Sequence, residues 1–322
     1  MTYILLVGGI KGGVGKTLVC RACIEYLNQR EFSTIAVDSD REIRDVSEFY
    51  QSELIGFSED FRKVMEPDKI LEIAEQNPDF IVVNLPGNTH QPLQEWLIST
   101  SSIQSRKAPD NQPQFIQFFV TDGCWSSIQL FLKSVSEHSG KLPHVLIRNS
   151  GRLMSSADWG YLDAVSEYRN ALENNCVLVA DFPLVATPVL FELDRQHLTF
   201  QGAVEGSSSL LARRTGFFVN QYTQMFDRIF EQLSGLVDGN FKPPKKTRKK
   251  VTIEDLASQL NQNVSVVTNA IASLRSPCFA NAQSNNPAEL ASNLSISEES
   301  LGITPDQYQK MKDKIPADSS VI

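Results

Sequence analysis

Short, continuous apolar runs recur along the first part of the chain, and polar stretches separate them. The runs are Tyr3–Val7, Thr34–Val37, Phe80–Val83, Phe115–Val120, His144–Ile147 and Val177–Ala180. Each has the length and continuity of a strand that is buried on both faces of a parallel sheet. The spacing between runs leaves room for a helix after most of them, as in successive βαβ units. The pattern therefore predicts an α/β fold, with a doubly wound, mainly parallel sheet.

Two segments show helical periodicity. Leu18–Gln29 follows the first apolar run, with apolar residues along one side. Leu210–Leu236 predicts a long helix, with apolar residues near a 3.6-residue period. They are Phe217, Phe218, Tyr222, Met225, Ile229, Phe230 and Leu233. We expect one large domain over residues 1–238, ending just after this long helix.

The composition changes after residue 238. Residues 239–250 hold two prolines and a dense basic run, which predicts a linker. Residues 251–276 predict a helical pair that begins at Thr252 as an N-cap and turns near Asn261. Residues 277–322 are polar and predict a loose tail with one short helix near Pro305–Lys314.

The helical pair at 251–276 has the spacing of a helix-turn-helix, and a basic run precedes it. The basic residues that are candidates for DNA phosphate contacts are Lys245, Lys246, Arg248, Lys249 and Lys250. The alternatives are a hairpin packed on the main domain, an extension of a dimer interface, or a site for a protein partner. The pattern alone leaves these open.

Composition narrows the class of protein. The chain has 322 residues, 41% of them hydrophobic, which suffices for a large core. The net charge of −8 argues against a constitutive nucleic-acid coat protein. The five cysteines are scattered, and Cys20 and Cys23 are expected to be small buried residues, not a metal or redox pair. No apolar stretch predicts a membrane span or signal peptide, so we expect a cytoplasmic protein without a membrane partner.

A glycine-rich segment directly after the first apolar run predicts a phosphate site. It reads Lys11-Gly12-Gly13-Val14-Gly15-Lys16-Thr17 and is followed by Leu18. Glycines let consecutive backbone N–H groups point at a polyphosphate, and the following helix contributes the positive end of its dipole. Lys16 supplies a charge between the outer phosphates, and the Thr17 hydroxyl is a Mg²⁺ ligand in such loops.

The loop departs from the general pattern, because Ile10 replaces its first glycine and a second lysine stands at Lys11. In this it resembles the deviant-Walker-A ATPases of the ParA, Soj and MinD family. The resemblance covers about residues 1–235. It implies that ATP and Mg²⁺ bind to residues 12–18, and that Lys11 crosses to the nucleotide of a second subunit in an ATP-sandwiched dimer. The alternative is that Lys11 is a solvated loop residue.

Two further strand ends carry polar residues. Asp38 and Asp40 follow the second apolar run, at the edge where ligands bind in open α/β sheets. The resemblance implies that Asp38 is needed for hydrolysis and for the Mg²⁺ shell, with Asp40 in support; the alternative is that Asp38 caps a turn. Asn84 replaces the aspartate of the family's second acidic motif, so we expect ATP binding with weaker Mg²⁺ retention and slow turnover.

The base of the nucleotide has two candidate contacts. Asn149 ends the fifth apolar run, and its amide pairs with both a donor and an acceptor, as adenine requires. Pro183 follows the sixth run, where the resemblance implies a proline packed beside the base. Asn and Pro are also ordinary turn residues, which is the alternative for both.

The resemblance implies an ATP-dependent dimerisation switch for DNA partition or for positioning a cargo such as a plasmid, chromosome or large protein assembly. Its partners would be a second copy, a cargo adaptor or a ParB/MinE-like activator, and non-specific DNA, which places the ATP-bound form on the nucleoid. Two other classes stay open, namely a non-hydrolysing regulatory adaptor and a metabolic or nitrogenase-iron-protein-like P-loop enzyme.

Overall fold

The computed structural model describes residues 1–40, 46–60, 62–87, 89–103, 112–138, 140–149, 151, 159–174, 177–206 and 209–237. The predicted linker at 239–250, the helical pair at 251–276 and the tail at 277–322 lie outside the described residues. The five basic residues proposed for DNA contact lie outside them too.

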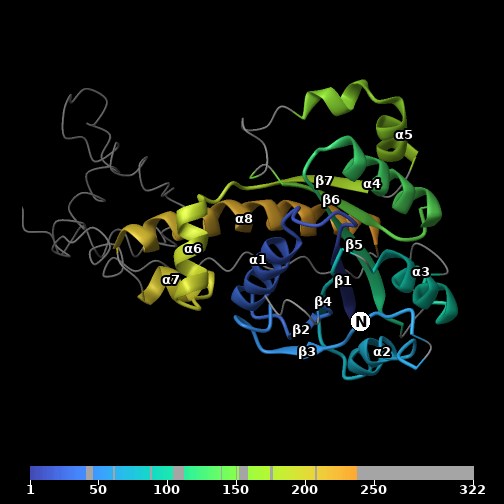
Figure 1. The fold of residues 1–322 in the computed structure, drawn as a ribbon, viewed down its shortest axis with the longest axis horizontal. Coiled ribbons are helices and arrows are strands. Elements are labelled where there is room, and N and C mark those ends of the chain that lie inside the picture. Colours follow the sequence, from blue (N-terminus) through green and yellow to red (C-terminus); the bar gives the residue numbers. More distant parts are fainter. Residues whose placement is uncertain are drawn as a thin grey trace, which may run out of the picture. The chain divides into compact units, whose positions relative to one another are not determined.

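A parallel sheet forms the centre of the described part of the chain (Figure 1). Its seven strands have the order β3-β2-β4-β1-β5-β6-β7, and every pairing between neighbours is parallel. The strands are β1 (Tyr3–Gly8), β2 (Thr34–Asp38), β3 (Ser52–Leu54), β4 (Phe80–Asn84), β5 (Gln114–Thr121), β6 (His144–Asn149) and β7 (Val177–Phe182). The predicted doubly wound α/β fold is confirmed.

The six predicted strands are all present, and each is longer than its apolar run. Polar residues at their carboxyl ends, such as Asp38, Asn84 and Asn149, continue the backbone hydrogen bonding. The short edge strand β3 was missed, because its three residues are not fully buried and show no apolar run. The strand ends therefore place polar side chains at one edge of the sheet, where the site lies.

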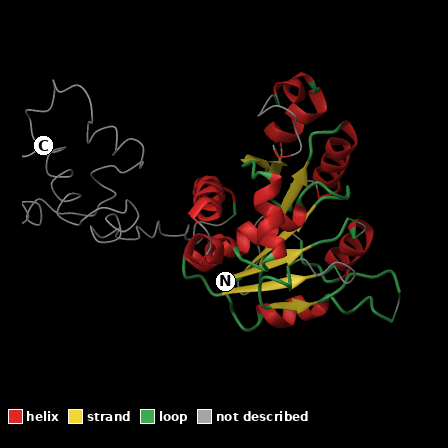
Figure 2. Ribbon diagram, turned by 60° about the vertical axis from the view of Figure 1, so that its left-hand side comes forward, coloured by secondary structure: helices red, strands yellow, loops and turns green. Residues whose placement is uncertain are grey.

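Helices cover both faces of the sheet (Figure 2). On one face, α1 (Lys16–Gln29), α6 (Thr187–Arg195), α7 (Phe200–Gly206) and α8 (Ser209–Leu236) share one core cluster. The other face is covered by α2 (Asp68–Ala74), α3 (His90–Ser99), α4 (Trp125–His138), a 3₁₀ turn (Gly160–Ala164) and α5 (Ser166–Asn174). Side chains of β1 alternate between the two cores, with Leu5 in the first and Leu6 in the second.

The long helix α8 confirms the helical period predicted for it, with one exception. Phe218, Tyr222, Phe226 and Phe230 follow one another at four-residue intervals and are buried against the sheet. Phe217 was predicted among the apolar positions, but its side chain is 65% exposed. It neighbours Phe218 in sequence, so on a helix it points about 100° away from that buried face.

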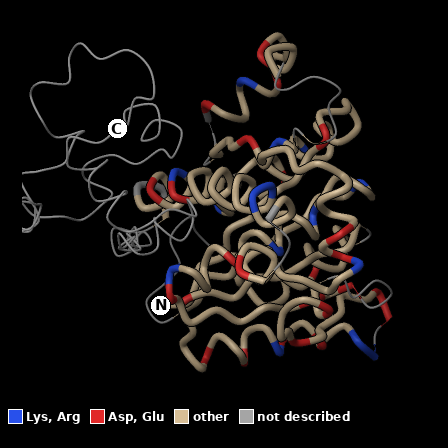
Figure 3. The backbone as a smooth tube through the Cα atoms, turned by 90° about the vertical axis from the view of Figure 1, so that its left-hand side faces the viewer, with Lys and Arg blue, Asp and Glu red and all other residues tan. Residues whose placement is uncertain are grey.

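The structure also bears on membrane spans, on the distribution of charge and on the burial of two cysteines. Among the described residues, no helix is both long and apolar enough to cross a bilayer. Charged residues of both signs are interspersed along the described chain (Figure 3). Cys20 and Cys23 are fully buried in α1, as predicted, and burial raises the pKa of both thiols.

A buried histidine makes the fold sensitive to acid. His144 begins β6, and its Nδ1 lies 2.8 Å from the Leu142 carbonyl oxygen and its Nε2 3.0 Å from the Ser134 hydroxyl. Burial lowers the pKa of His144 from 6.5 to about 4. The unfolded chain therefore binds one more proton than the folded protein between these values, so stability falls as the pH drops through this window.

We expect this single group to remove about 3 kcal/mol from the free energy of unfolding between pH 7 and pH 4. Urea unfolding of the wild type and of His144→Gln at pH 7.0, 6.0 and 5.0 measures the effect. The variant should lose less stability over this range than the wild type. Equal losses in the two proteins would contradict the assignment to His144.

Candidate functional site: a phosphate loop and the cavity beside it

The predicted phosphate loop connects β1 to α1 at the carboxyl edge of the sheet. Helix α1 begins at Lys16, and Gly15 precedes it as N-cap with a φ of 98°. Only glycine adopts such a conformation without strain. Gly9 makes a close approach, since a Cβ there would stand 2.6 Å from the Val120 carbonyl oxygen of β5. These two glycines fix the loop against the sheet and direct the helix N-terminus outward.

Two glycines of the loop should differ sharply in their tolerance of alanine. A Cβ on Gly15 would clash with the Asn149 side-chain amide at a strained φ, whereas a Cβ on Gly12 would have no heavy atom within 4 Å. We expect Gly15→Ala to lower the free energy of unfolding by about 2–4 kcal/mol. Gly12→Ala is the matched control and should stay close to the wild type. Urea unfolding of both variants tests this, and equal stabilities would contradict it.

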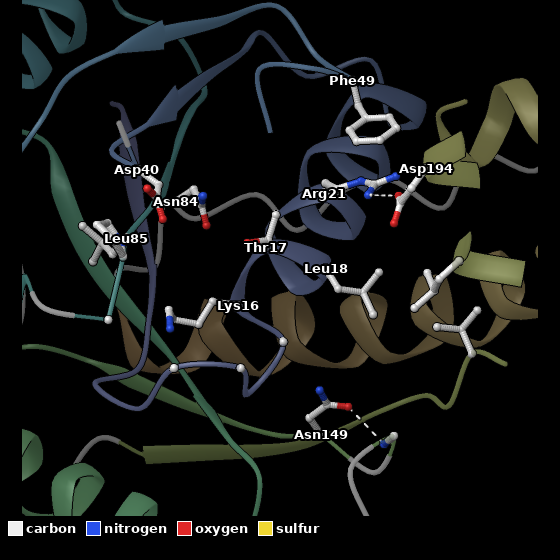
Figure 4. Close-up of a pocket in the computed structure, with 18 of the residues that line it drawn as sticks. Lys16, Thr17, Leu18, Arg21, Asp40, Phe49, Asn84, Leu85, Asn149 and Asp194 are labelled. Carbon is white, nitrogen blue, oxygen red and sulfur yellow. Dashed lines mark hydrogen bonds and ion pairs between the residues drawn. The ribbon is translucent and has the colours of Figure 1, made fainter. Parts of the chain in front are cut away.

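A cavity of about 720 Å³ opens beside the loop (Figure 4). The predicted site residues that line it come from the loop and from the ends of β2, β4, β6 and β7. They are Gly12, Gly13, Gly15, Lys16, Thr17, Leu18, Asp40, Asn84, Asn149 and Pro183. Lys11, Val14 and Asp38 are not among its described lining residues. The structure thus brings together most of the residues chosen from the sequence.

Lys16 is the main positive charge of this cavity. The residue is only 9% exposed, and its Nζ donates a hydrogen bond to the Lys11 carbonyl oxygen at 3.0 Å. Burial lowers the pKa of Lys16, and the Asp40 carboxylate opposes that effect. A partly desolvated ammonium beside a glycine-rich helix N-terminus is well suited to an anionic ligand such as a phosphate.

The two acidic residues after β2 have different surroundings. Asp38 is fully buried, and its carboxylate accepts hydrogen bonds from the Asn84 amide at 3.0 Å, from the Val46 and Ser47 backbone N–H groups, and from the Ser47 hydroxyl. Asp40 lines the cavity. Asp40 therefore faces the ligand space, whereas Asp38 is held by the residues behind it, and the catalytic roles predicted for both stay predictions.

Asn84 lines the cavity and also contacts the buried Asp38. Its amide nitrogen donates to Asp38, while its buried Oδ1 has no hydrogen-bond partner among the described residues. Asn84, Thr17 and Asp40 project into the same part of the cavity (Figure 4). An unpartnered buried acceptor beside a hydroxyl and a carboxylate fits a Mg²⁺ ion with its water shell. Among the described residues, no three His, Cys, Asp or Glu side chains form a closer metal cluster.

Both candidate base contacts, Asn149 and Pro183, line the cavity. Asn149 donates to the Val14 carbonyl oxygen at 2.7 Å, and its Oδ1 accepts the Gly151 N–H at 3.0 Å. Its amide therefore ties the phosphate loop to the end of β6, a role that the sequence did not indicate. Pro183 lines the cavity with Val185 and Leu190, which form an apolar wall beyond the loop.

The second lysine of the loop points elsewhere. The Lys11 Nζ lies 2.6 Å from Oδ2 of Asp122, which directly follows β5. The Lys11 side chain is 36% exposed. The hydrogen bond to Asp122 raises the pKa of Lys11. Lys11 is thus neither a cavity residue nor a freely solvated one within this subunit.

Sequence reasoning missed a buried arginine at the far end of the cavity. Arg21 lies one turn after Thr17 on α1, stacks 3.5 Å from the centre of the Phe49 ring, and pairs with Asp194 of α6 at 2.8 Å. The available signal was a charged residue on the apolar side of a predicted helix. The pair links α1 to α6, and both of its residues line the cavity.

The strand order, the glycine-rich loop and the cavity beside it are those of an α/β fold of the P-loop NTPase type. No protein-family model matches the sequence. Protein MobD of Acidithiobacillus ferrooxidans is 36% identical over 84 residues, which are 25% of this chain. The matched segment spans about a third of that relative, 35% of its length.

Similar solved structures include those of a septum site-determining protein and a plasmid partition protein. MinD of Pyrococcus horikoshii with Mg-ADP is 18% identical, covering 69% of this chain and 96% of that one, with a TM-score of 0.43. An ATP complex of Cyanothece McdA is 10% identical, covering 70% and 97%, with a TM-score of 0.41. A plasmid partition protein of Borrelia burgdorferi is 16% identical, covering 54% and 97%, with a TM-score of 0.34.

These likenesses match the predicted resemblance to ParA and MinD at the level of the fold.

Proposed function

We propose that this protein is an ATP-dependent dimerisation switch that acts in DNA partition or in the positioning of an intracellular cargo. The observation that best supports this proposal is the different placement of the two lysines of the loop. Lys16 lines the cavity, whereas Lys11 is not among the described lining residues and has a side chain that is 36% exposed. Because Lys16 supplies the charge for the phosphates within one subunit, we assign the second lysine to the nucleotide of a second copy.

In this proposal the loop backbone and Lys16 hold the ATP phosphates at the N-terminus of α1. Thr17 and Asn84 hold the hydrated Mg²⁺, which would neutralise phosphate charge, and Pro183 packs beside the base. Asp40 orients the attacking water, with Asp38 fixing the loop that carries Asp40. Lys11 of the second subunit stabilises the charge that develops during phosphoryl transfer.

The switch would turn over slowly until an activator intervenes. Asn84 offers a neutral oxygen where a carboxylate would bind Mg²⁺ more strongly, and Asp38 is already occupied by hydrogen bonds. A ParB/MinE-like activator or cargo adaptor would stimulate hydrolysis and return the protein to a monomer. The ATP-bound dimer would bind non-specific DNA, with Lys245, Lys246, Arg248, Lys249 and Lys250 as further phosphate contacts.

A second candidate is a regulatory adaptor that binds ATP but does not hydrolyse it. One observation favours it, namely that the Asp38 carboxylate is fully buried and accepts hydrogen bonds from both backbone and side-chain donors. Measuring phosphate release with Mg-ATP, with and without DNA, separates the two candidates. The adaptor predicts ATP-dependent association with no release of phosphate under either condition.

The switch itself is tested by sedimentation velocity and DNA binding of the full chain, with and without Mg-ATP. We expect a monomer without nucleotide, a dimer with Mg-ATP, and DNA binding that follows the dimer. Lys11→Ala should still bind ATP but remain a monomer. If Mg-ATP changes neither the association state nor the DNA affinity of the wild type, the proposal is wrong.

A further inference from the structure

Lys11 forms an ion pair with Asp122 of its own subunit. It belongs to the loop after β1, and Asp122 follows β5, the neighbouring strand on the side away from β4. The register pairs Gly8 with Phe119, so the two strand ends deliver both side chains to the same edge of the sheet. Their charged atoms meet at 2.6 Å, a short, charge-assisted hydrogen bond.

Asp122 is the fixed member of this pair. Its second oxygen, Oδ1, accepts the Cys124 backbone N–H at 3.2 Å, just before α4 begins, and its side chain is only 13% exposed. Burial works against its ionised form, but the hydrogen bond from Lys11 holds the pKa of Asp122 below its usual value. Asp122 is therefore ionised while it pairs with Lys11, and its second oxygen is held separately by the Cys124 backbone N–H.

Lys11 is the movable member. Its side chain is 36% exposed, and its ammonium is attached through four flexible methylene groups. Its backbone is held separately, since its carbonyl oxygen accepts the hydrogen bond from Lys16 Nζ. The side chain can leave Asp122 without any change in the loop that forms the phosphate site. A partly exposed pair of this kind is weak enough to be exchanged.

We propose that Asp122 is a competitor for Lys11, and that a second copy of this chain with its bound nucleoside triphosphate displaces the Asp122 carboxylate when the dimer forms. This inference rests on the proposed dimerisation switch and names the intramolecular contact that opposes it. A triphosphate displaces a carboxylate more readily than a diphosphate does, because it carries more charge. Asp122 thereby reduces association of the empty and ADP-bound forms.

The test compares wild type with Asp122→Asn, which keeps the shape of the side chain and the acceptor for Cys124 N–H but removes the charge. Each dimer would release two such pairs, so Asp122→Asn should tighten Mg-ATP-dependent association by roughly 3- to 20-fold. The substitution should also reduce the difference between the dimer association constants measured with Mg-ATP and with Mg-ADP. Sedimentation equilibrium of the full chain measures both effects.

Asp181→Asn is the matched control. Asp181 forms a comparable ion pair with Arg148, also at 2.6 Å, at the end of β7 on the same edge of the sheet. Removing its charge should leave association close to the wild type. If Asp122→Asn associates as the wild type does, or more weakly, while the wild type forms a dimer with Mg-ATP, then Asp122 does not compete for Lys11 and the inference is wrong.

A second readout does not depend on dimerisation. In nucleotide-free protein, Lys11 should react more slowly with acetic anhydride in the wild type than in Asp122→Asn, as measured by mass spectrometry of the loop peptide. Equal reactivity would show that the pair does not hold Lys11 and would overturn the inference. A different outcome is that the Lys11 reactivity differs between the two proteins but the wild type does not dimerise with Mg-ATP. The proposed dimerisation switch is then wrong, and so is the proposal that a second copy competes with Asp122.

Discussion

Lys16→Ala should lower the affinity for Mg-ATP at least about a hundredfold, since it removes a charge-assisted contact to a polyphosphate in a desolvated site. Lys16 lines the cavity, is nine-tenths buried and is held toward the loop by its hydrogen bond to the Lys11 carbonyl. No other lysine or arginine among the described residues of the loop lines this cavity. Isothermal titration of the full chain with Mg-ATP measures the loss.

Two control variants make this result specific. Lys16→Gln keeps a donor for the Lys11 carbonyl but lacks the charge, so it separates loop conformation from electrostatics. Lys133 on α4 is 57% exposed, and Lys133→Ala should bind Mg-ATP as the wild type does. The role given to Lys16 would have to be abandoned if both Lys16 variants were folded and bound Mg-ATP with wild-type affinity.

Asn84→Asp should have the second large effect. It should destabilise the nucleotide-free protein but strengthen Mg²⁺ binding when Mg-ATP is present. In the nucleotide-free protein an aspartate at this position would face the buried Asp38 carboxylate across a distance that is now a 3.0 Å hydrogen bond. Two like charges without water raise the pKa of one of them. We expect the free energy of unfolding at pH 7 to fall by about 2–4 kcal/mol.

The pH dependence of this variant follows from the same pair. A carboxyl whose pKa is raised in the folded protein binds its proton more tightly there than in the unfolded chain. The stability of Asn84→Asp relative to wild type should therefore recover as the pH falls from 7 to 5. Urea unfolding at both values measures this recovery, and a constant difference would contradict the contact with Asp38.

With Mg-ATP present the same substitution should be favourable for the metal. The added carboxylate supplies the charge that Asn84 lacks, so Mg²⁺ should bind more tightly and hydrolysis should be faster. Asn84→Ala, which removes both the donor and the free acceptor, should weaken Mg²⁺ binding instead. Unchanged Mg²⁺ affinity and turnover in Asn84→Asp would contradict the role given to Asn84.

The fold was predictable because its signals are local. The continuous apolar runs of β1, β4 and β5 allow no solvated face, which favours a parallel sheet covered on both sides. The loop was equally predictable, since consecutive glycines before Lys16 define its backbone conformation. The edge strand β3 and the short helices carry weaker patterns and were not identified.

The contacts within the site were less predictable, because each joins residues far apart in the chain. Asp38 meets Asn84 only because β2 pairs with β4 in the register that places them side by side. Asn149 reaches the loop from β6, and Arg21 finds Asp194 on α6. The sequence marked several of these residues as polar at strand ends but did not show which partners they have.

The sequence by itself determined the phosphate loop, its two lysines and the parallel α/β sheet, because backbone preference and hydrophobic periodicity act over a few consecutive residues. The tertiary structure alone decided how the loop's charged groups are distributed. Lys16 and Asp40 line the cavity, whereas Lys11 forms an ion pair with Asp122. The Asp38 carboxylate accepts a hydrogen bond from the Asn84 amide. Those partners are set by strand order and register, which bring together residues that the chain itself keeps far apart.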